Sequence, residues 1–124
     1  RMREFAATVL EPKGIEYNFL LDENVKDLVL DMEARRDFFL IFKEAVNNLA
    51  KYSGADHAEI SIAMKQGKLI MTIRDNGTGF ENESADTGNG LTNMQKRAEK
   101  MKGRLQIISG KNRGTAIHLE VPLT

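Results

Sequence analysis

The sequence predicts an α+β domain, a two-layer α/β sandwich with a mixed, mostly antiparallel sheet and helices on one face. Two observations predict it. Segments with alternating apolar residues come mostly in pairs joined by short turns, and three segments with helical apolar spacing lie among them. Paired strands of this kind leave the helices to stack together on the sheet. At 124 residues, the chain is long enough for one sizeable core, so residues 1–124 are expected to form one domain.

The first half of the chain contains two of these helices. Apolar residues at helical spacing predict a helix over residues 1–10, and an alternating pattern predicts a strand over residues 15–21. A shorter strand is expected over residues 27–30. Asp31 is the expected N-cap of a long helix over residues 33–52, whose apolar residues follow the helical repeat.

Strand patterns dominate the second half. Four strands and one helix are expected there: strands over residues 58–64, 68–74, 105–109 and 115–121, and a helix over residues 91–102. Gln66 and Gly67 form a hairpin turn between the first two of these strands. Gly103 is the expected C-terminal cap of the helix.

The composition excludes several classes of function. Lys plus Arg and Asp plus Glu both number 18, so no basic surplus attracts nucleic acid, and no nucleic-acid partner is expected. The absence of cysteine excludes disulfides and cysteine-ligated zinc, and it is compatible with a cytoplasmic domain. No apolar run approaches the ~20 residues of a membrane span. Because the chain begins with Arg1, we expect a segment of a longer protein.

Three polar side chains share one side of the long helix, about a third of a turn from its apolar stripe. They are Glu44, Asn48 and Lys51. The amide oxygen of Asn48 suits Mg²⁺, an ammonium group such as that of Lys51 neutralises phosphate, and Glu44 can orient or deprotonate an attacking group. The spacing alone also allows a solvated helix face without a function.

A second candidate group follows the strand over residues 68–74. Asp75 is a hydrogen-bond acceptor that could read the exocyclic amine of adenine, and Gly77 and Gly79 would let the backbone approach the base. The alternative is a simple turn at the end of a strand, because Asp-Asn-Gly is a strong turn signal. A calcium loop is excluded, since the repeated oxygen ligands of an EF-hand are missing.

The third candidate group is a glycine pair at the start of the helix over residues 91–102. Gly88 and Gly90 would leave backbone N–H groups and the helix dipole available to phosphates, although flexible-loop glycines are an equal alternative. Neither a Walker A motif nor a complete dinucleotide fingerprint occurs. Residues 81–87, between the second and third groups, are expected to form a mobile loop.

Taken in order, the three groups resemble the motifs of a known family. Residues 44–53, 75–80 and 88–97 resemble the N, G1 and G2 boxes of sensor histidine kinases, and residues 114–123 fit the last strand of that family. The chain is thus similar to the GHKL, or Bergerat-fold, ATPases from about Asp31 onward. The short gap before Gly88 resembles the subgroup with abbreviated ATP lids.

The resemblance implies a role for each matched residue. Asn48 would hold Mg²⁺, Glu44 would act at the transfer step and Lys51 would contact phosphate. Asp75 would bind the adenine amine, together with Gly77, Gly79 and Thr115. Gly88, Gly90 and Leu91 would lie at the phosphates. Tyr52 would also belong to the ATP site, at a position where close relatives often have His. ATP and Mg²⁺ would bind between the long helix and a lid formed by residues 81–87.

The resemblance also implies a function. The γ-phosphoryl group of ATP would pass to a histidine on separate dimerisation helices, which are absent from this chain, and then to a response regulator. The fragment would be monomeric and its parent a homodimer, anchored in the inner membrane in some members of the family. His57 and His118 have no evident partners, so they are not expected to accept the phosphoryl group. An anti-sigma-type protein-serine kinase and a non-catalytic nucleotide-sensing module of the same fold remain alternatives.

Overall fold

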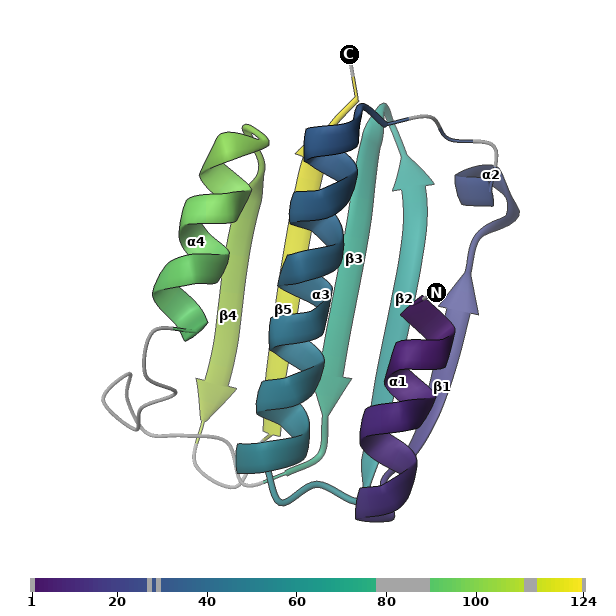
Figure 1. Cartoon of the computed structure of the whole chain (residues 1–124), viewed down its shortest axis with the longest axis vertical. Helices are drawn as coiled ribbons and strands as arrows, with labels where there is room; N and C mark the ends of the chain where they lie inside the picture. The colour runs from purple at the N-terminus through teal and green to yellow at the C-terminus, as the bar shows by residue number, and fades with distance from the viewer. Residues whose placement is uncertain (1, 27, 29, 78–89, 111–113, 124) are drawn as a thin grey trace.

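The computed structural model describes residues 2–26, 28, 30–77, 90–110 and 114–123. A sheet forms one layer, and the helices α1, α3 and α4 lie together on one of its faces (Figure 1). The elements are α1 (Met2–Leu10), η1 (Glu11–Lys13), β1 (Glu16–Leu21), α2 (Glu23–Lys26), α3 (Met32–Tyr52), β2 (His57–Lys65), β3 (Lys68–Asp75), α4 (Gly90–Lys100), β4 (Arg104–Gly110) and β5 (Gly114–Pro122). This arrangement confirms the predicted α+β sandwich.

The sheet has five strands in the order β1-β2-β3-β5-β4. β1 and β2 are parallel, whereas the other three pairs are antiparallel. The parallel pair requires a crossover connection, and α3 supplies it. The prediction of a mixed, mostly antiparallel sheet is therefore confirmed.

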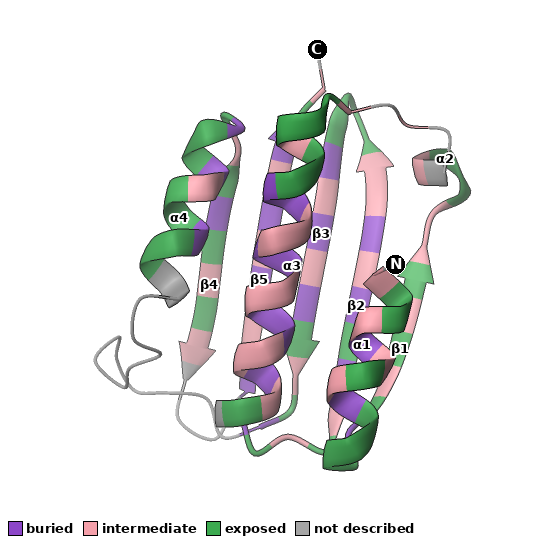
Figure 2. Ribbon diagram, viewed as in Figure 1, coloured by how far each residue is buried: buried purple, intermediate pink, exposed green. Residues whose placement is uncertain are grey.

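The core lies between the helices and the inner face of the sheet. Along β2, β3 and β5, buried residues alternate with more exposed ones, as the predicted strand patterns require (Figure 2). Phe42 of α3 is fully buried, and its ring lies 6.2 Å from those of Phe5 and Phe19 and 6.3 Å from that of Phe39. This aromatic cluster joins α1 and β1 to α3, so the side of α3 that faces α1 is committed to packing.

The predicted strand over residues 27–30 is wrong. A one-turn helix, α2, follows β1, and Leu28 and Leu30 belong to no strand in the described part of the chain. Local turn bonds explain the difference, because the Val25 N–H donates to the Asp22 carbonyl (3.0 Å) and the Leu28 N–H donates to Val25 (3.1 Å). Donors used in this way are not available to a strand ladder.

The caps and turns agree with the sequence in most details. The Asp31 side chain accepts a hydrogen bond from the Ala34 N–H at 2.8 Å, which confirms the N-cap of α3. Gln66 and Gly67 both have positive φ (52° and 76°), as a tight hairpin requires. At the end of α4, however, the left-handed residue is Lys102 (φ 58°) rather than a glycine.

Gly103 takes the next position of this cap. Its N–H donates to the Ala98 carbonyl at 2.8 Å and the Lys102 N–H donates to Glu99 at 2.9 Å, which together form a Schellman motif. A Cβ atom at Gly103 would lie 2.7 Å from the Glu120 carbonyl oxygen. Glycine is thus required at this position by close packing against β5 and not by its own dihedral angles.

None of the helices in the described ranges is long and apolar enough to span a membrane.

Candidate functional site

The predicted site residues gather at one end of the sandwich. α3 and β3 end there, and β5 begins there, at the lower end of the molecule in Figure 1. Lys51 therefore comes from the last turn of α3, Asp75 from the last position of β3 and Thr115 from the second position of β5. Three segments far apart in the sequence bring these side chains to the same end of the domain.

The helical part of the site lies along α3. Glu44 and Asn48 are half-buried, and Lys51 is exposed in the last turn. Their spacing of four and three residues places them one above another on the helix. Asp37 lies on the same side, seven residues before Glu44, and its carboxylate contacts α4. The polar side of α3 therefore faces α4, on the flank opposite the aromatic cluster.

Asp75 forms the part of the site that comes from the sheet. Its half-buried carboxylate accepts a hydrogen bond from the Gly77 N–H at 2.8 Å. Burial raises the pKa of Asp75 above its usual value, and backbone hydrogen bonds from Gly77 and Thr115 oppose the shift. An ionised carboxylate has further lone pairs. The environment thus suits a ligand that donates a hydrogen bond, such as the exocyclic amine of adenine.

Two close backbone approaches hold Asp75 in place. A Cβ atom at Gly77 would overlap the carbonyl oxygen of Ser53, at the end of α3. Gly114, at the start of β5, has a φ of 78°, and its Cβ would overlap the Asp75 carbonyl oxygen. Glycine at position 77 therefore lets α3 and β3 converge, a role that the sequence did not reveal. Gly114 was not among the predicted site residues.

Asn76, which the sequence predicts only as part of a turn, is a further structural residue at this end of the domain. Its side-chain oxygen accepts from the backbone N–H groups of Asp56 and His57, both at 3.1 Å, and its amide nitrogen donates to the Asp56 carboxylate at 2.7 Å. These bonds join the loop after α3 to the end of β3. Ser53 is the C-cap residue of α3, and its hydroxyl donates a hydrogen bond to the Leu49 carbonyl at 2.6 Å.

The remaining predicted residues are described in part or not at all. Thr115 is the register partner of Asp75, and its hydroxyl lies 3.0 Å from that of Ser109. Gly90 opens α4 and Leu91 follows it in the first turn, whereas only the backbone of Tyr52 is described, in the last turn of α3. Gly79, Gly88 and the predicted lid over residues 81–87 lie outside the described residues.

A large apolar hollow lies elsewhere on the molecule. It measures about 730 Å³, and its lining includes Phe19, Phe38 and Phe39 together with side chains of α1. None of the predicted site residues that the structure describes lines it. The large hollow and the predicted site residues therefore lie at different places on the molecule, and the candidate site is placed where hydrogen-bonding and charged groups gather.

Comparison with known families agrees with this geometry. Residues 33–124 match the family described as histidine kinase-, DNA gyrase B-, and HSP90-like ATPase. The chain belongs to this ATPase family. The match covers Glu44, Asn48, Asp75 and Thr115, so the ATPase domain includes both the helical and the sheet part of the site.

Curated relatives of the ATPase domain are named as sensor kinases. It is 34% identical to the oxygen sensor histidine kinase NreB of Staphylococcus carnosus over 113 residues, which cover 90% of this chain and 32% of NreB. It is 34% identical to the histidine-protein kinase/phosphatase DegS of Brevibacillus brevis over 87 residues (69% of this chain, 22% of DegS). It is 30% identical to the sensor protein VraS of Staphylococcus aureus over 134 residues (92% of this chain, 38% of VraS). The chain thus spans between 22% and 38% of the length of these relatives.

Solved structures show the same fold. The histidine kinase domain of the blue-light activated histidine kinase EL346 from Erythrobacter litoralis superposes with a TM-score of 0.81 at 17% identity, over 98% of this chain and 59% of that one. The histidine kinase AdeS of Acinetobacter baumannii gives a TM-score of 0.76 at 18% identity, over 99% and 64% of the two chains. At these identities the likeness establishes the fold of the ATPase domain.

Replacing Gly77 with alanine tests the contact between α3 and β3. The added methyl group would meet the Ser53 carbonyl, so we expect G77A to lower the free energy of unfolding by roughly 1–3 kcal/mol and to weaken ATP binding. Urea denaturation and calorimetric titration measure the two effects. G67A is the matched control, because the space around Gly67 is open and the variant carries only dihedral strain, at the other end of β3. If G77A has the same free energy of unfolding as the wild type, the close contact between Gly77 and the Ser53 carbonyl is contradicted.

Replacing Asp75 with asparagine separates stability from binding. Because burial raises the pKa of Asp75, the ionised carboxylate lowers folding stability above that pKa, and the neutral amide should raise Tm at pH 7. The gain should vanish as the pH falls through the raised pKa to below the usual 3.8, where the wild-type carboxyl is itself neutral. ATP affinity should fall about ten- to a hundredfold. Thermal melts between pH 3 and 7 provide the check, and a lower Tm for D75N at pH 7 would contradict it.

Proposed function

We propose that this chain is the ATP-binding catalytic domain of a sensor histidine kinase. Such a domain transfers the γ-phosphoryl group of ATP to a histidine on separate dimerisation helices, and the phosphoryl group then passes to a response regulator. One observation carries the proposal. In a member of this ATPase family, a half-buried acceptor, Asp75, lies at the same end of the sandwich as the polar stripe of Glu44, Asn48 and Lys51.

Each end of the nucleotide is matched by one part of the site. The Asp75 carboxylate would accept a hydrogen bond from the adenine amine, a contact that guanine cannot make because it presents a carbonyl there. The first turn of α4, which begins at Gly90, would direct backbone N–H groups toward the phosphates. Lys51 would neutralise phosphate charge. Binding of this kind positions the γ-phosphorus, and positioning accounts for most of catalysis in phosphoryl transfer.

The residues present fit a magnesium ion held together with the nucleotide. Among the described residues, no group of three or more His, Cys, Asp or Glu side chains could hold a metal. Mg²⁺ in phosphoryl-transfer sites is bound through one or two protein oxygens plus phosphate oxygens, and the amide oxygen of Asn48 is of the required type. When bound, Mg²⁺ would supply neutralisation of phosphate charge.

Glu44 is the residue that we assign to the transfer step. A nitrogen of the acceptor imidazole attacks the γ-phosphorus, the bond from phosphorus to the bridging oxygen breaks, and ADP leaves with the electron pair. The imidazole proton released in this step would pass to the Glu44 carboxylate. Its position one helical turn before Asn48 is suitable, because the general base and the proposed Mg²⁺ ligand then lie on the same side of α3.

The partners follow from the same proposal. The acceptor helices would belong to the parent polypeptide, and a response regulator would receive the phosphoryl group. The domain by itself would be monomeric, and the parent would act as a homodimer. We place the domain in the cytoplasm, where ATP is available, and a membrane anchor of the parent would lie outside residues 1–124. The kinase names of the relatives favour a histidine acceptor over a serine.

Replacing Asn48 with alanine should weaken Mg²⁺-dependent ATP binding. Loss of an oxygen that contacts a charged group predicts about a ten- to hundredfold lower affinity in the presence of Mg²⁺ and a much smaller change in EDTA. Isothermal titration with and without Mg²⁺ measures both affinities. N47A is the matched control, because Asn47 is the same residue type on the adjacent, differently directed position of α3. Equal affinities of N48A and wild type in Mg²⁺ would show that Asn48 is not the metal ligand.

The domain by itself should bind ATP without phosphorylating itself. Contrary to the sequence analysis, His118 has partners, since its ring nitrogens lie 3.3 Å from the Thr72 hydroxyl and 3.0 Å from the Glu120 carboxylate. His57 lies 4.0 Å from Glu59. Glu59 and His118 alternate with the buried residues of β2 and β5, so they lie on the face of the sheet opposite the helices, away from Glu44. Incubation with γ-labelled ATP checks this, and acid-labile label on the isolated chain would contradict it.

A further inference from the structure

The packing of α4 on α3 uses a small and adaptable apolar face. Its buried residues are Met94 and Ala98, and Met101 is buried directly after the helix. Methionine side chains are flexible and fill spaces of different shape, and alanine offers only one methyl group. Apolar packing of this kind stabilises contact between the helices, but it specifies poorly how far one helix is shifted along the other.

A buried carboxylate paired with two partly exposed cations supplies the missing specificity. Asp37 of α3 is only 2% exposed, and it is the buried carboxylate of the described part of the chain. One of its oxygens lies 3.3 Å from a guanidinium nitrogen of Arg97, and the other lies 3.7 Å from the ammonium nitrogen of Lys100. Both cations come from the last turns of α4, one helical turn apart. Because the Asp37 carboxylate is buried, separating it from both cations is costly, and this cost favours the register of α4 in which the two contacts form. We call Asp37, Arg97 and Lys100 the Asp37 cluster.

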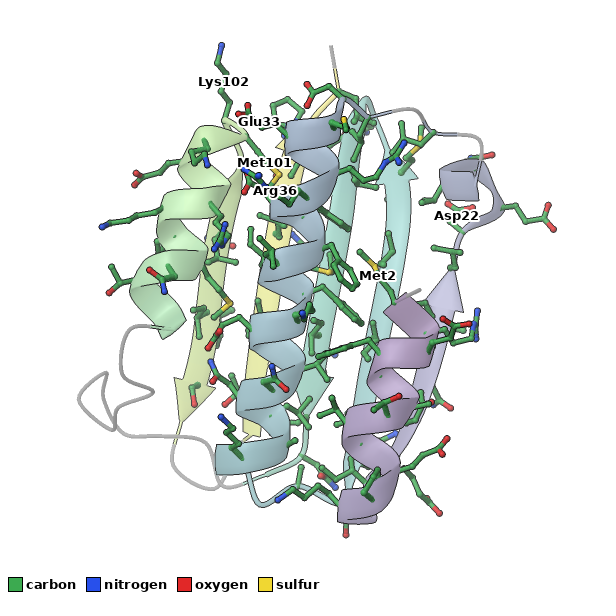
Figure 3. All side chains as sticks on the ribbon, in the orientation of Figure 1. Met2, Asp22, Glu33, Arg36, Met101 and Lys102 are labelled. Atoms are coloured by element: carbon green, nitrogen blue, oxygen red, sulfur yellow. The ribbon has the colours of Figure 1, made fainter. Side chains whose placement is uncertain are left out.

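The cluster lies at a defined distance from the phosphate end of the site. α3 and α4 are antiparallel, and Met101 and Lys102, which directly follow α4, lie beside the first turns of α3 at Glu33 and Arg36 (Figure 3). Gly90 precedes Arg97 by seven residues, and Glu44 follows Asp37 by seven residues. At about 1.5 Å per residue, both intervals measure about 10 Å. The start of α4 is therefore level with Glu44, and Asn48 lies one turn beyond it, where the N–H groups of α4 point.

We propose that the Asp37 cluster is a positioning device for the phosphate half of the nucleotide site. It sets the register of α4 along α3, and that register fixes the distance from the first turn of α4 to Glu44 and Asn48. The adenine half does not depend on α4, because Asp75, Gly77 and Thr115 belong to β3, the turn after it and β5. The inference rests on the proposed function, since it assumes that ATP occupies this site.

The test compares ATP with adenosine, which has the base and no phosphates. In D37N the carboxamide keeps the shape of the side chain and removes its charge. We expect ATP affinity to fall about tenfold, within the usual range of coupling between two sites, while adenosine affinity stays within about twofold of wild type. R97Q should behave in the same way, and R97K, which retains a cation, should recover most of the ATP affinity. The affinities are measured by NMR or calorimetric titration at 10 °C on variants whose circular dichroism shows the native fold.

A neighbouring cation on α4, Lys96, provides the control for these variants. K96Q removes an exposed cation next to Arg97 on α4 that makes no ion pair within the described residues, and it should bind both ligands like wild type. Equal losses of ATP and adenosine affinity in D37N and R97Q would overturn the inference, because they would indicate general structural damage. Unchanged ATP affinity in both variants would also overturn it. Wild-type protein that does not bind ATP would instead refute the proposed function itself.

Discussion

The site depends on the close approach of three backbones at one end of the sandwich. The end of α3 at Ser53, the turn after β3 at Gly77 and the start of β5 at Gly114 come so near that a Cβ atom at either glycine would overlap a neighbouring carbonyl group. Since backbone overlap cannot be relieved by rotating a side chain, the contact fixes the elements relative to one another. The position of Asp75 next to α3 follows from this contact.

The same contact places a carboxylate where burial disfavours its charge. The raised pKa of Asp75 shows that the two backbone N–H bonds from Gly77 and Thr115 do not fully compensate for the loss of water. A ligand that donates a hydrogen bond to this carboxylate would offset part of that loss. Next to it, Asn76 stabilises the surrounding loop through three side-chain hydrogen bonds.

The two flanks of α3 have different surroundings: one packs on apolar residues and the other carries polar side chains. On one flank, Phe42 and its aromatic neighbours attach the helix to α1 and β1. On the other flank, a polar stripe runs from Asp37 through Glu44 to Asn48 and faces α4. In the proposed site, the groups for the base would therefore come from the sheet and the groups for the phosphates from two helices.

The sequence alone determined what depends on near neighbours along the chain. The helical repeat placed Glu44, Asn48 and Lys51 together, and alternation identified the strands that carry Asp75 and Thr115, because both periods are local properties. The strand predicted over residues 27–30 was wrong, because local turn hydrogen bonds near Val25 use donors that a strand would need. Only the tertiary structure decided the burial of Asp37, whose cation partners lie about sixty residues away, and the overlap that requires glycine at 77 and 114. Contacts of this kind leave no periodic trace in a single sequence, since they depend on how separate elements pack.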